Sequence, residues 1–379
     1  NEGTPKYDGE TLTDYLEQLG TSVGGAAGWD SASLSMTVLR ANLDNAFAHF
    51  AEVLVTPTFP TVAIERLKGE RIAELMQIES EPRELADEKF DEYIYEEASR
   101  FRVPLGGTRE SVNTLTRERV VAFHASRYQP AATTLIVVGD VDVDTAERMV
   151  SSALGAWVGA TVPRAAADDR PARTTRSVRI VRKEDAPQSE VRVGHVGVPR
   201  THADYFSITV MNAILGGLFS SRINLNLREA HGYTYGASSA FDWRREAGPF
   251  VVGTAVASDV TAAAITEVLK EIDRMRAEPV TESELSLATS YLGGVFPIRY
   301  ETTAAIAAAL ATLTIYNLPA DWYDTYRARI AAVTVDDVLD AARAHVRPES
   351  LQIVVVGDPD AIRGQLDALA FGSLDVVSP

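Results

Sequence analysis

The amino-acid sequence predicts an α+β fold of two tandem homologous domains, each a mostly antiparallel sheet flanked by helices. Three observations predict it. Segments with the alternating pattern of strands are interspersed with longer segments of helical periodicity. Part of the second half repeats the first half in register. Between the halves, a stretch rich in Ala, Arg, Asp and Pro has no apolar period and is typical of a linker. The expected division is a first domain over 1–160, a linker over 161–176 and a second domain over 177–379.

In the first half, the apolar spacing predicts helices over 11–19, 42–55, 62–78, 115–128 and 144–154. A second helical run is expected to follow the helix over 62–78 and to continue to about residue 100. Gly20 is expected to end the first of these helices. Alternation predicts a strand over 32–39, and a continuous apolar run predicts a buried strand over 134–138.

In the second half, the same criteria predict strands over 177–181, 190–198, 250–257 and 351–356. They predict helices over 205–215, 260–277 and 334–345, with more helix between 277 and 316. The apolar stretch 304–316 is short, alanine-rich and interrupted by threonines, so it is expected to be a buried helix rather than a membrane span.

The internal repeat aligns the segment that starts at Leu115 with the segment that starts at Val333. Without a gap, Pro130 then falls on Pro348, and the Val-Val-Gly-Asp sequence of the first half falls on that of the second. The second half also has two strands and a helix over 177–215 with no full counterpart in the first half. The first domain is therefore predicted to lack its opening strands.

The stretch 216–243 is interpreted as a glycine turn, a short helix, a stop and a strand. Ser220 or Ser221 is expected to cap the helix, because a serine oxygen accepts a free backbone N–H there. Gly232 is expected to end it, because glycine adopts the left-handed conformation that other residues avoid. A strand over 233–241 follows.

Within this stretch, Ile223 and Leu227 recur at helical spacing and are expected to face the core. That places Arg228 in the last helical turn and Tyr235 on the adjoining strand. A guanidinium and a phenol are both hydrogen-bond donors at neutral pH, and such donors suit a peptide carbonyl or the oxyanion formed from it. Tyr233 would share the strand face of Tyr235 by the period of two, either lining the same cleft or packing in the core.

The composition excludes several function classes. The formal net charge is -17 and is spread along the chain, which argues against nucleic acid or an anionic membrane as a partner. The chain has no cysteine, which excludes disulfides, thiol nucleophiles and thiolate metal sites and fits the cytoplasm and the periplasm equally. Because the chain opens with Asn1 in mid-pattern, an upstream segment is expected to be missing.

The sequence spacing predicts no metal site in this chain. No histidine lies in an H-E-x-x-H or H-x-x-E-H pattern, and no two histidines have helical i, i+4 spacing. Zinc needs three or four nitrogen, thiolate or carboxylate ligands, and the sequence offers no such cluster. Asp140, Asp142 and Asp144 mimic a calcium loop, but Thr145 replaces the required glycine and no glutamate follows at the twelfth position. A turn and a helix cap are expected there instead. Neither G-x-G-x-x-G nor G-x-S-x-G occurs.

The segment from Leu227 to Tyr235 resembles the C-terminal domain of the pitrilysin or insulinase-type zinc peptidases. In that family an Arg and a Tyr occur in the pattern L-R-(six residues)-Y, here Arg228 and Tyr235. The duplicated layout resembles the family too, whose paired α+β domains form half-shells around a catalytic chamber. The start, Asn1 to Thr4, is similar to the x-x-Gly-Thr that follows the zinc motif His-x-x-Glu-His, which would end just upstream.

Two departures from the catalytic pattern accompany this resemblance. On the spacing of the family, Glu74 falls about where the third zinc ligand lies, although a glutamate on a helix surface is the simpler interpretation. Catalytic members tend to carry an acidic residue one helical repeat earlier, where this chain has Leu67. The opening Asn-Glu-Gly-Thr is more similar to the start of non-catalytic partner subunits.

The resemblance implies the non-catalytic subunit of a heterodimeric zinc endopeptidase. A homologous partner subunit would carry the zinc and the general base, and this chain would carry no cofactor. It would close the peptide chamber and supply Arg228 and Tyr235 as catalytic residues. Gly216, Gly217 and Tyr233 would contact the peptide substrate.

Two alternatives stay open. The chain could be a truncated catalytic peptidase whose zinc motif lies upstream of residue 1, or an inert structural or binding homologue such as the core subunits of respiratory complexes. In the favoured interpretation the isolated chain shows no peptidase activity and binds no zinc stoichiometrically.

Overall fold

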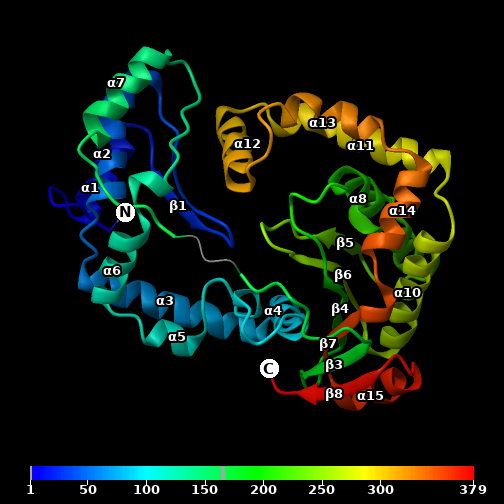
Figure 1. Ribbon diagram of the computed structural model, residues 1–379. Helices are drawn as coiled ribbons and strands as arrows, with labels where there is room; N and C mark the ends of the chain where they lie inside the picture. The colour runs from blue at the N-terminus through cyan, green and yellow to red at the C-terminus, as the bar shows by residue number, and fades with distance from the viewer. Residues whose placement is uncertain (1, 164–166) are drawn as a thin grey trace. The chain divides into compact units, whose positions relative to one another are not determined.

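The structure is a computed structural model that describes residues 2–163 and 167–379 (Figure 1). Residue 1, and residues 164–166 of the expected linker, lie outside the described residues. The chain forms two compact units. The first unit contains residues 1–75, 107–165 and 299–318, and the second unit contains residues 76–106, 166–298 and 319–379. Both combine helices with a sheet, which confirms the predicted α+β class.

The second unit is built on a six-stranded sheet with the order β5-β6-β4-β7-β3-β8. The strands are β3 (Ser177–Arg182), β4 (Gln188–Val196), β5 (Ala237–Phe241), β6 (Pro249–Ala257), β7 (Gln352–Gly357) and β8 (Ser373–Val377). β4 runs antiparallel to β6 and β7, and β5 antiparallel to β6, whereas β3 runs parallel to β7 and β8. Every residue of the inner strand β7 is buried, as its continuous apolar run predicts.

Helices surround this sheet. They are α4 (Pro82–Ile94), α8 (Tyr205–Asn212), α9 (Arg222–Asn224), α10 (Thr261–Ala277), α11 (Glu282–Arg299), α13 (Trp322–Ala331), α14 (Val335–His345) and α15 (Pro359–Ala368). Two π-helical turns, η4 (Ala213–Gly217) and η5 (Leu225–Ala230), and the 3-10 turns η2 (Arg100–Arg102), η6 (Ser258–Val260) and η7 (Pro348–Ser350) complete the unit.

The compact units do not follow the expected division into 1–160 and 177–379. Residues 76–106 belong to the second unit, and residues 299–318 belong to the first. The order of the elements along the chain does not show to which unit these two segments belong. Their unit depends on the sheet or helices against which each helix packs its apolar face.

The packing of α4 explains why it belongs to the second unit. Phe90 is 2% exposed, and the helix packs on β4 and β7. Buried Arg192 of β4 donates to the carboxylate of Asp87 on α4. The hydroxyl of Tyr93 donates to Oγ of Ser177 on β3 at 2.7 Å. Apolar burial, the charge-assisted bond to Asp87 and the neutral bond between hydroxyls together fix the helix on this sheet.

The first unit has a two-stranded sheet, β1 (Val23–Ala27) with β2 (Ala32–Met36). Its helices are α1 (Gly9–Gln18), α2 (Leu43–Val55), α3 (Thr61–Ser80, which continues past the unit boundary), α5 (Arg109–Asn113), α6 (Arg117–Arg127), α7 (Val143–Leu154) and α12 (Thr303–Tyr316), with 3-10 turns η1 (Arg40–Asn42) and η3 (Pro130–Ala132). The core gathers apolar side chains of α1, β1 and α2, namely Leu12, Leu16, Val23, Phe47 and Phe50. Gly20 has φ +71° just after α1, as a helix stop requires.

The internal repeat is confirmed in the local structure. Thr116 caps α6 by accepting a hydrogen bond from a backbone N–H three residues on, and the aligned Thr334 caps α14 in the same way. Pro130 begins η3 and the aligned Pro348 begins η7. The two halves therefore share the start of this helix and the proline turn that follows it.

The expected buried strand over 134–138 is wrong. The segment forms no strand, and its side chains are half-buried or exposed. Its counterpart β7 is hydrogen-bonded to β3 on one side and β4 on the other. Within the described part of the first unit, the sheet consists of β1 and β2. A strand forms only where neighbours satisfy its backbone groups, so the apolar run alone does not suffice.

The expectation that residues 304–316 form a buried helix is half right. α12 is helical, but Ala309 is its one buried side chain, and Leu310 is 39% exposed. Apolar composition does not create a packing partner.

A different segment, Tyr205–Ala230, is long and apolar enough to span a membrane by length and composition. Of its most apolar 18-residue stretch, 61% is buried inside the protein. That burial is what a core helix of the second unit requires.

Candidate functional site

The glycine pair that precedes the candidate site has two different environments. Gly216 is buried against β5, and a Cβ there would lie 2.5 Å from the backbone N of Ser239. Such a contact is sterically excluded, so close packing requires glycine at this position. Gly217 is exposed, and a Cβ there would lie 3.1 Å from the side chain of Asn212.

The start of α9 is held by an ion pair rather than by a serine cap. Ser221 occupies the N-cap position, but its side chain makes no cap hydrogen bond. The expected hydrogen-bonded cap by Ser220 or Ser221 is therefore wrong. The guanidinium of Arg222 instead donates to both carboxylate oxygens of Glu284, at 2.6 and 2.9 Å. These hydrogen bonds lower the pKa of Glu284 to about 2.

Arg228 lies on η5, whose other face is buried. Ile223 and Leu227 are 0% exposed, which confirms that they face the core. The guanidinium of Arg228 lies 4.6 Å from the ring centroid of Phe219, and its Nε lies 3.5 Å from a carboxylate oxygen of Glu229. The side chain of Arg228 is 36% exposed. A cation over an aromatic ring is held in place while its outer N–H groups stay accessible.

The helix ends at Gly232 as predicted, with φ +65°. The backbone N–H of Tyr233 then donates to the carbonyl of Leu227 at 2.9 Å and closes the last turn. The half-buried ring of Tyr233 stacks on His231, with 5.0 Å between centroids.

The expected strand over 233–241 is wrong in its first half, because β5 begins at Ala237. Tyr233 and Tyr235 therefore do not share a strand face. The hydroxyl of Thr234 donates to the carbonyl of Gly236 and accepts from its N–H, at 2.9 and 3.1 Å. This local side-chain bonding replaces ladder bonds and turns the backbone.

Tyr235 is carried outward by this turn. It is 93% exposed, and its hydroxyl has no hydrogen-bond partner among the residues that the structure describes. The turn itself is fixed, because Thr254 of β6 donates to the hydroxyl of Thr234 at 3.1 Å. The exposed phenol thus projects from an anchored backbone.

Asn224 is a positioning residue that the sequence did not indicate. It is 3% exposed. Its Nδ2 donates to the carbonyl of Phe219 at 2.6 Å, and its Oδ1 accepts from the N–H of Ala237 at 3.0 Å. It therefore ties the turn under Arg228 to the residue where β5 begins, two positions after Tyr235. An amide on the buried side of a short helix is the signal that could have revealed it.

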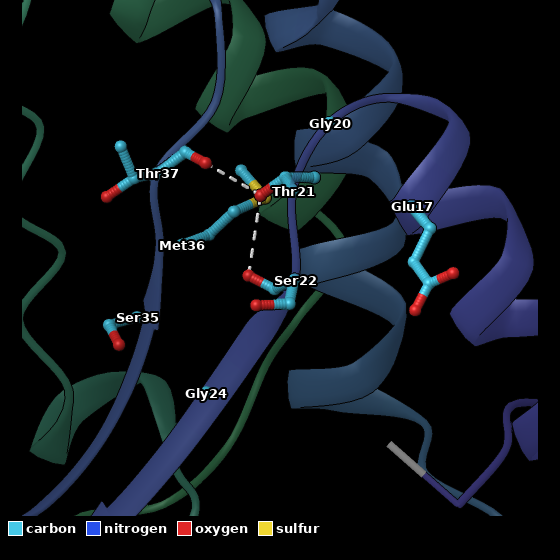
Figure 2. Close-up of a pocket in the computed structure, with 8 residues that line it drawn as sticks. All are labelled: Glu17, Gly20, Thr21, Ser22, Gly24, Ser35, Met36 and Thr37. Atoms are coloured by element: carbon cyan, nitrogen blue, oxygen red, sulfur yellow. Dashed lines mark hydrogen bonds between the residues drawn. The ribbon is translucent and has the colours of Figure 1, made fainter.

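The described residues also line two pockets that lie away from Arg228 and Tyr235. One, of about 540 Å³, lies beside β1 and β2 in the first unit and is shown in Figure 2. It is lined mainly by glycines and hydroxyl side chains, with Thr21 donating to the carbonyl of Thr37 at 2.8 Å. The other, of about 560 Å³, lies beside Trp322 and Arg329 in the second unit. Neither pocket is lined by the Arg228 and Tyr235 side chains.

Glu74 does not belong to the cluster of potential metal ligands that the described residues form. Glu74 on α3 pairs with Arg71 at 2.7 Å. Among the described residues, the histidine and carboxylate groups close enough to hold one metal ion are His202, Asp204 and His345. In the aspartate-rich turn, Asp142 caps α7 by accepting from a backbone N–H, as expected for a helix cap.

Comparisons with known proteins identify the relatives of this chain. Residues 1–103 match the family described as Insulinase (Peptidase family M16), and residues 114–292 match the Peptidase M16 inactive domain. An uncharacterized zinc protease of Streptomyces coelicolor is 25% identical over 350 residues, which are 90% of this chain and 75% of the relative. A non-peptidase homolog of Helicobacter pylori is 23% identical over 365 residues, 94% of this chain and 82% of the relative.

Solved structures agree with this result. The peptidase M16 inactive domain from Pseudomonas fluorescens has a TM-score of 0.88 at 26% identity, covering 94% of this chain and 86% of the other. A protease from Helicobacter pylori shares the fold with a TM-score of 0.85 at 16% identity, covering 94% of this chain and 87% of the other. Arg228 and Tyr235 both lie inside the segment that matches the inactive domain.

Proposed function

The chain belongs to the M16 peptidase family, and we propose that it is a non-catalytic subunit of a zinc metalloendopeptidase. Its 379 residues contain no H-x-x-E-H sequence. Leu67 stands where the resemblance to catalytic members favours an acidic residue. In this proposal a homologous partner subunit carries the catalytic zinc and the general base, and this chain completes the peptide-binding chamber.

The observation that carries the proposal is the placement of Arg228 and Tyr235. They have the L-R-(six residues)-Y spacing, and both are accessible to a ligand. The phenol hydroxyl is free to donate, and the guanidinium is held over Phe219 with N–H groups to spare. Two such donors stabilise the negative charge that develops on a peptide carbonyl oxygen during hydrolysis.

The neighbouring residues have supporting roles in this proposal. Gly217 is exposed and Tyr233 is half-buried, so both offer surface to a bound peptide. Gly216 is assigned to packing, because β5 occupies the space that a side chain would need. The acidic net charge of -17 favours neutral or basic peptides.

A digestion assay tests the proposal. The isolated chain, a candidate homologous subunit with an H-x-x-E-H sequence, and their mixture would each be incubated with an unstructured peptide. We expect cleavage by the mixture and none by the isolated chain. Cleavage by the isolated chain would reject the proposal in favour of a catalytic peptidase. That alternative is supported by the zinc protease name of the Streptomyces coelicolor relative.

Variants separate the proposal from an inert homologue. If Arg228→Ala and Tyr235→Phe leave turnover by the mixture unchanged, the two side chains have no part in the reaction. The chain would then act through its surface alone, as a structural or binding subunit.

A further inference from the structure

Three potential metal ligands converge in the second unit although they are far apart in the sequence. His202 and Asp204 lie in the turn that leads into α8, and His345 is the last residue of α14. α8 and α14 pack against each other. One ligand atom from each residue lies within 4.8 Å of the other two. Nε2 of His345 is 2.7 Å, and Nδ1 of His202 3.9 Å, from Oδ2 of Asp204.

The backbone holds His202 and Asp204 in this arrangement. The N–H of His202 donates to the carbonyl of Pro199 at 3.0 Å, and the N–H of Tyr205 donates to the carbonyl of His202 at 3.1 Å. Asp204 occupies the N-cap position of α8, yet its carboxylate makes no cap hydrogen bond. An aspartate at this position normally accepts a backbone N–H. Here the carboxylate faces His345 across the helix pair instead.

We propose that His202, Asp204 and His345 bind one divalent transition-metal ion, with zinc as the best fit. Two imidazole nitrogens and a carboxylate oxygen are ligands that zinc prefers, and a water molecule would complete a tetrahedral set. At bond lengths of about 2.0–2.2 Å, tetrahedral ligand atoms lie about 3.4 Å apart. The observed 2.7 and 3.9 Å separations bracket that value.

Small side-chain movements complete the site. The side chain of His202 is about one-third exposed, and its ring lies edge to face with His345, with 4.7 Å between centroids. Its Nδ1 currently accepts a 3.2 Å hydrogen bond from the N–H of Asp204, which the metal would replace. The metal would also replace the hydrogen bond between Nε2 of His345 and the carboxylate of Asp204. His345 is 8% exposed, which gives the site one rigid, buried ligand.

The inferred ion joins the start of α8 to the end of α14 and is separate from the proposed peptide-binding pair. It replaces the expectation that this chain binds no zinc, which rested on sequence spacing. No spacing rule reveals it, because His345 lies 141 positions after Asp204. Its role in this position is to stabilise the second unit.

Calorimetric titration of the tag-free, chelator-treated chain with zinc sulfate tests the proposal. We expect one zinc per chain, and a visible absorption band typical of tetrahedral Co²⁺ when cobalt is used instead. His202→Ala and Asp204→Asn should each weaken binding by at least the roughly 10–100-fold that loss of an outer-shell partner costs, because a direct ligand is lost or weakened. His231→Ala is the matched control, since His231 also lies near one carboxylate, 3.6 Å from Glu267. It should bind as the wild type does.

The zinc-dependent rise in melting temperature provides a second measurement. It should appear in the wild type and in His231→Ala and disappear in His202→Ala, which leaves the contact between Asp204 and His345 intact. Binding below one zinc per chain, or full binding by His202→Ala, would overturn the proposal. Neither measurement uses the partner subunit or a peptide, so its result is independent of the proposed function.

Discussion

Replacing Tyr235 with phenylalanine removes one hydroxyl that has no hydrogen-bond partner among the described residues. The ring is 93% exposed, so the free energy of unfolding should change by less than about 0.5 kcal/mol. If the hydroxyl donates to the oxyanion of the substrate, its loss removes about 3 kcal/mol of transition-state stabilisation, or about 100-fold or more in kcat. The stability effect and the activity effect therefore differ by several-fold in free energy.

The assay is cleavage of a quenched fluorescent peptide by the assembled pair at saturating substrate, with zinc content and subunit ratio checked for each preparation. Tyr291→Phe is the control, because Tyr291 is a half-exposed tyrosine of the second unit, on α11. We expect kcat to fall for Tyr235→Phe with little change in KM, and to stay at the wild-type value for Tyr291→Phe. A kcat within about twofold of the wild type for Tyr235→Phe would refute the reasoning.

Three further predictions concern the scaffold. Glu284→Gln should lower the unfolding free energy by about 3 kcal/mol in urea titration, because it leaves the guanidinium of Arg222, 7% exposed, without its carboxylate. Asn224→Ala removes two buried hydrogen bonds, so it should cost about 1–3 kcal/mol and speed hydrogen exchange of the Ala237 amide. Burial, then the charge of a neighbouring arginine, lowers the pKa of His195 to about 3. The unfolded chain takes up that proton near pH 6.5, so the histidine makes stability fall as pH falls from about 6.5 to 3. Relative to His195→Asn, the wild type should lose up to about 1.4 kcal/mol per pH unit in that window.

The features that the sequence predicted correctly depend on neighbours in the chain. Gly232 ends its helix because of its own backbone freedom, and Leu227 is buried because of helical spacing. The Thr caps of α6 and α14 are equally local, which is why the internal repeat could be recognised. Family resemblance extended these patterns to a whole fold.

The features that it missed depend on distant partners. Residues 134–138 have the apolar run of a strand but no neighbouring strands, whereas the aligned β7 has one on each side. The three candidate metal ligands are joined only by the packing of α8 on α14. Tyr235 left the expected strand because the side chain of Thr234 satisfies the local backbone groups. Periodicity does not contain any of this information.

The exposure of Tyr235 is informative because the backbone on each side of it is fixed. Thr234 is bonded to β6 on one side, and Ala237 is bonded to buried Asn224 on the other. A frayed loop would leave an aromatic ring exposed by chance, but a turn with four anchoring hydrogen bonds holds it outward. Holding an aromatic ring in water gains the fold nothing. It does prepare a hydrogen-bond donor for a ligand without further ordering, which is the condition under which such a donor contributes most to binding and catalysis.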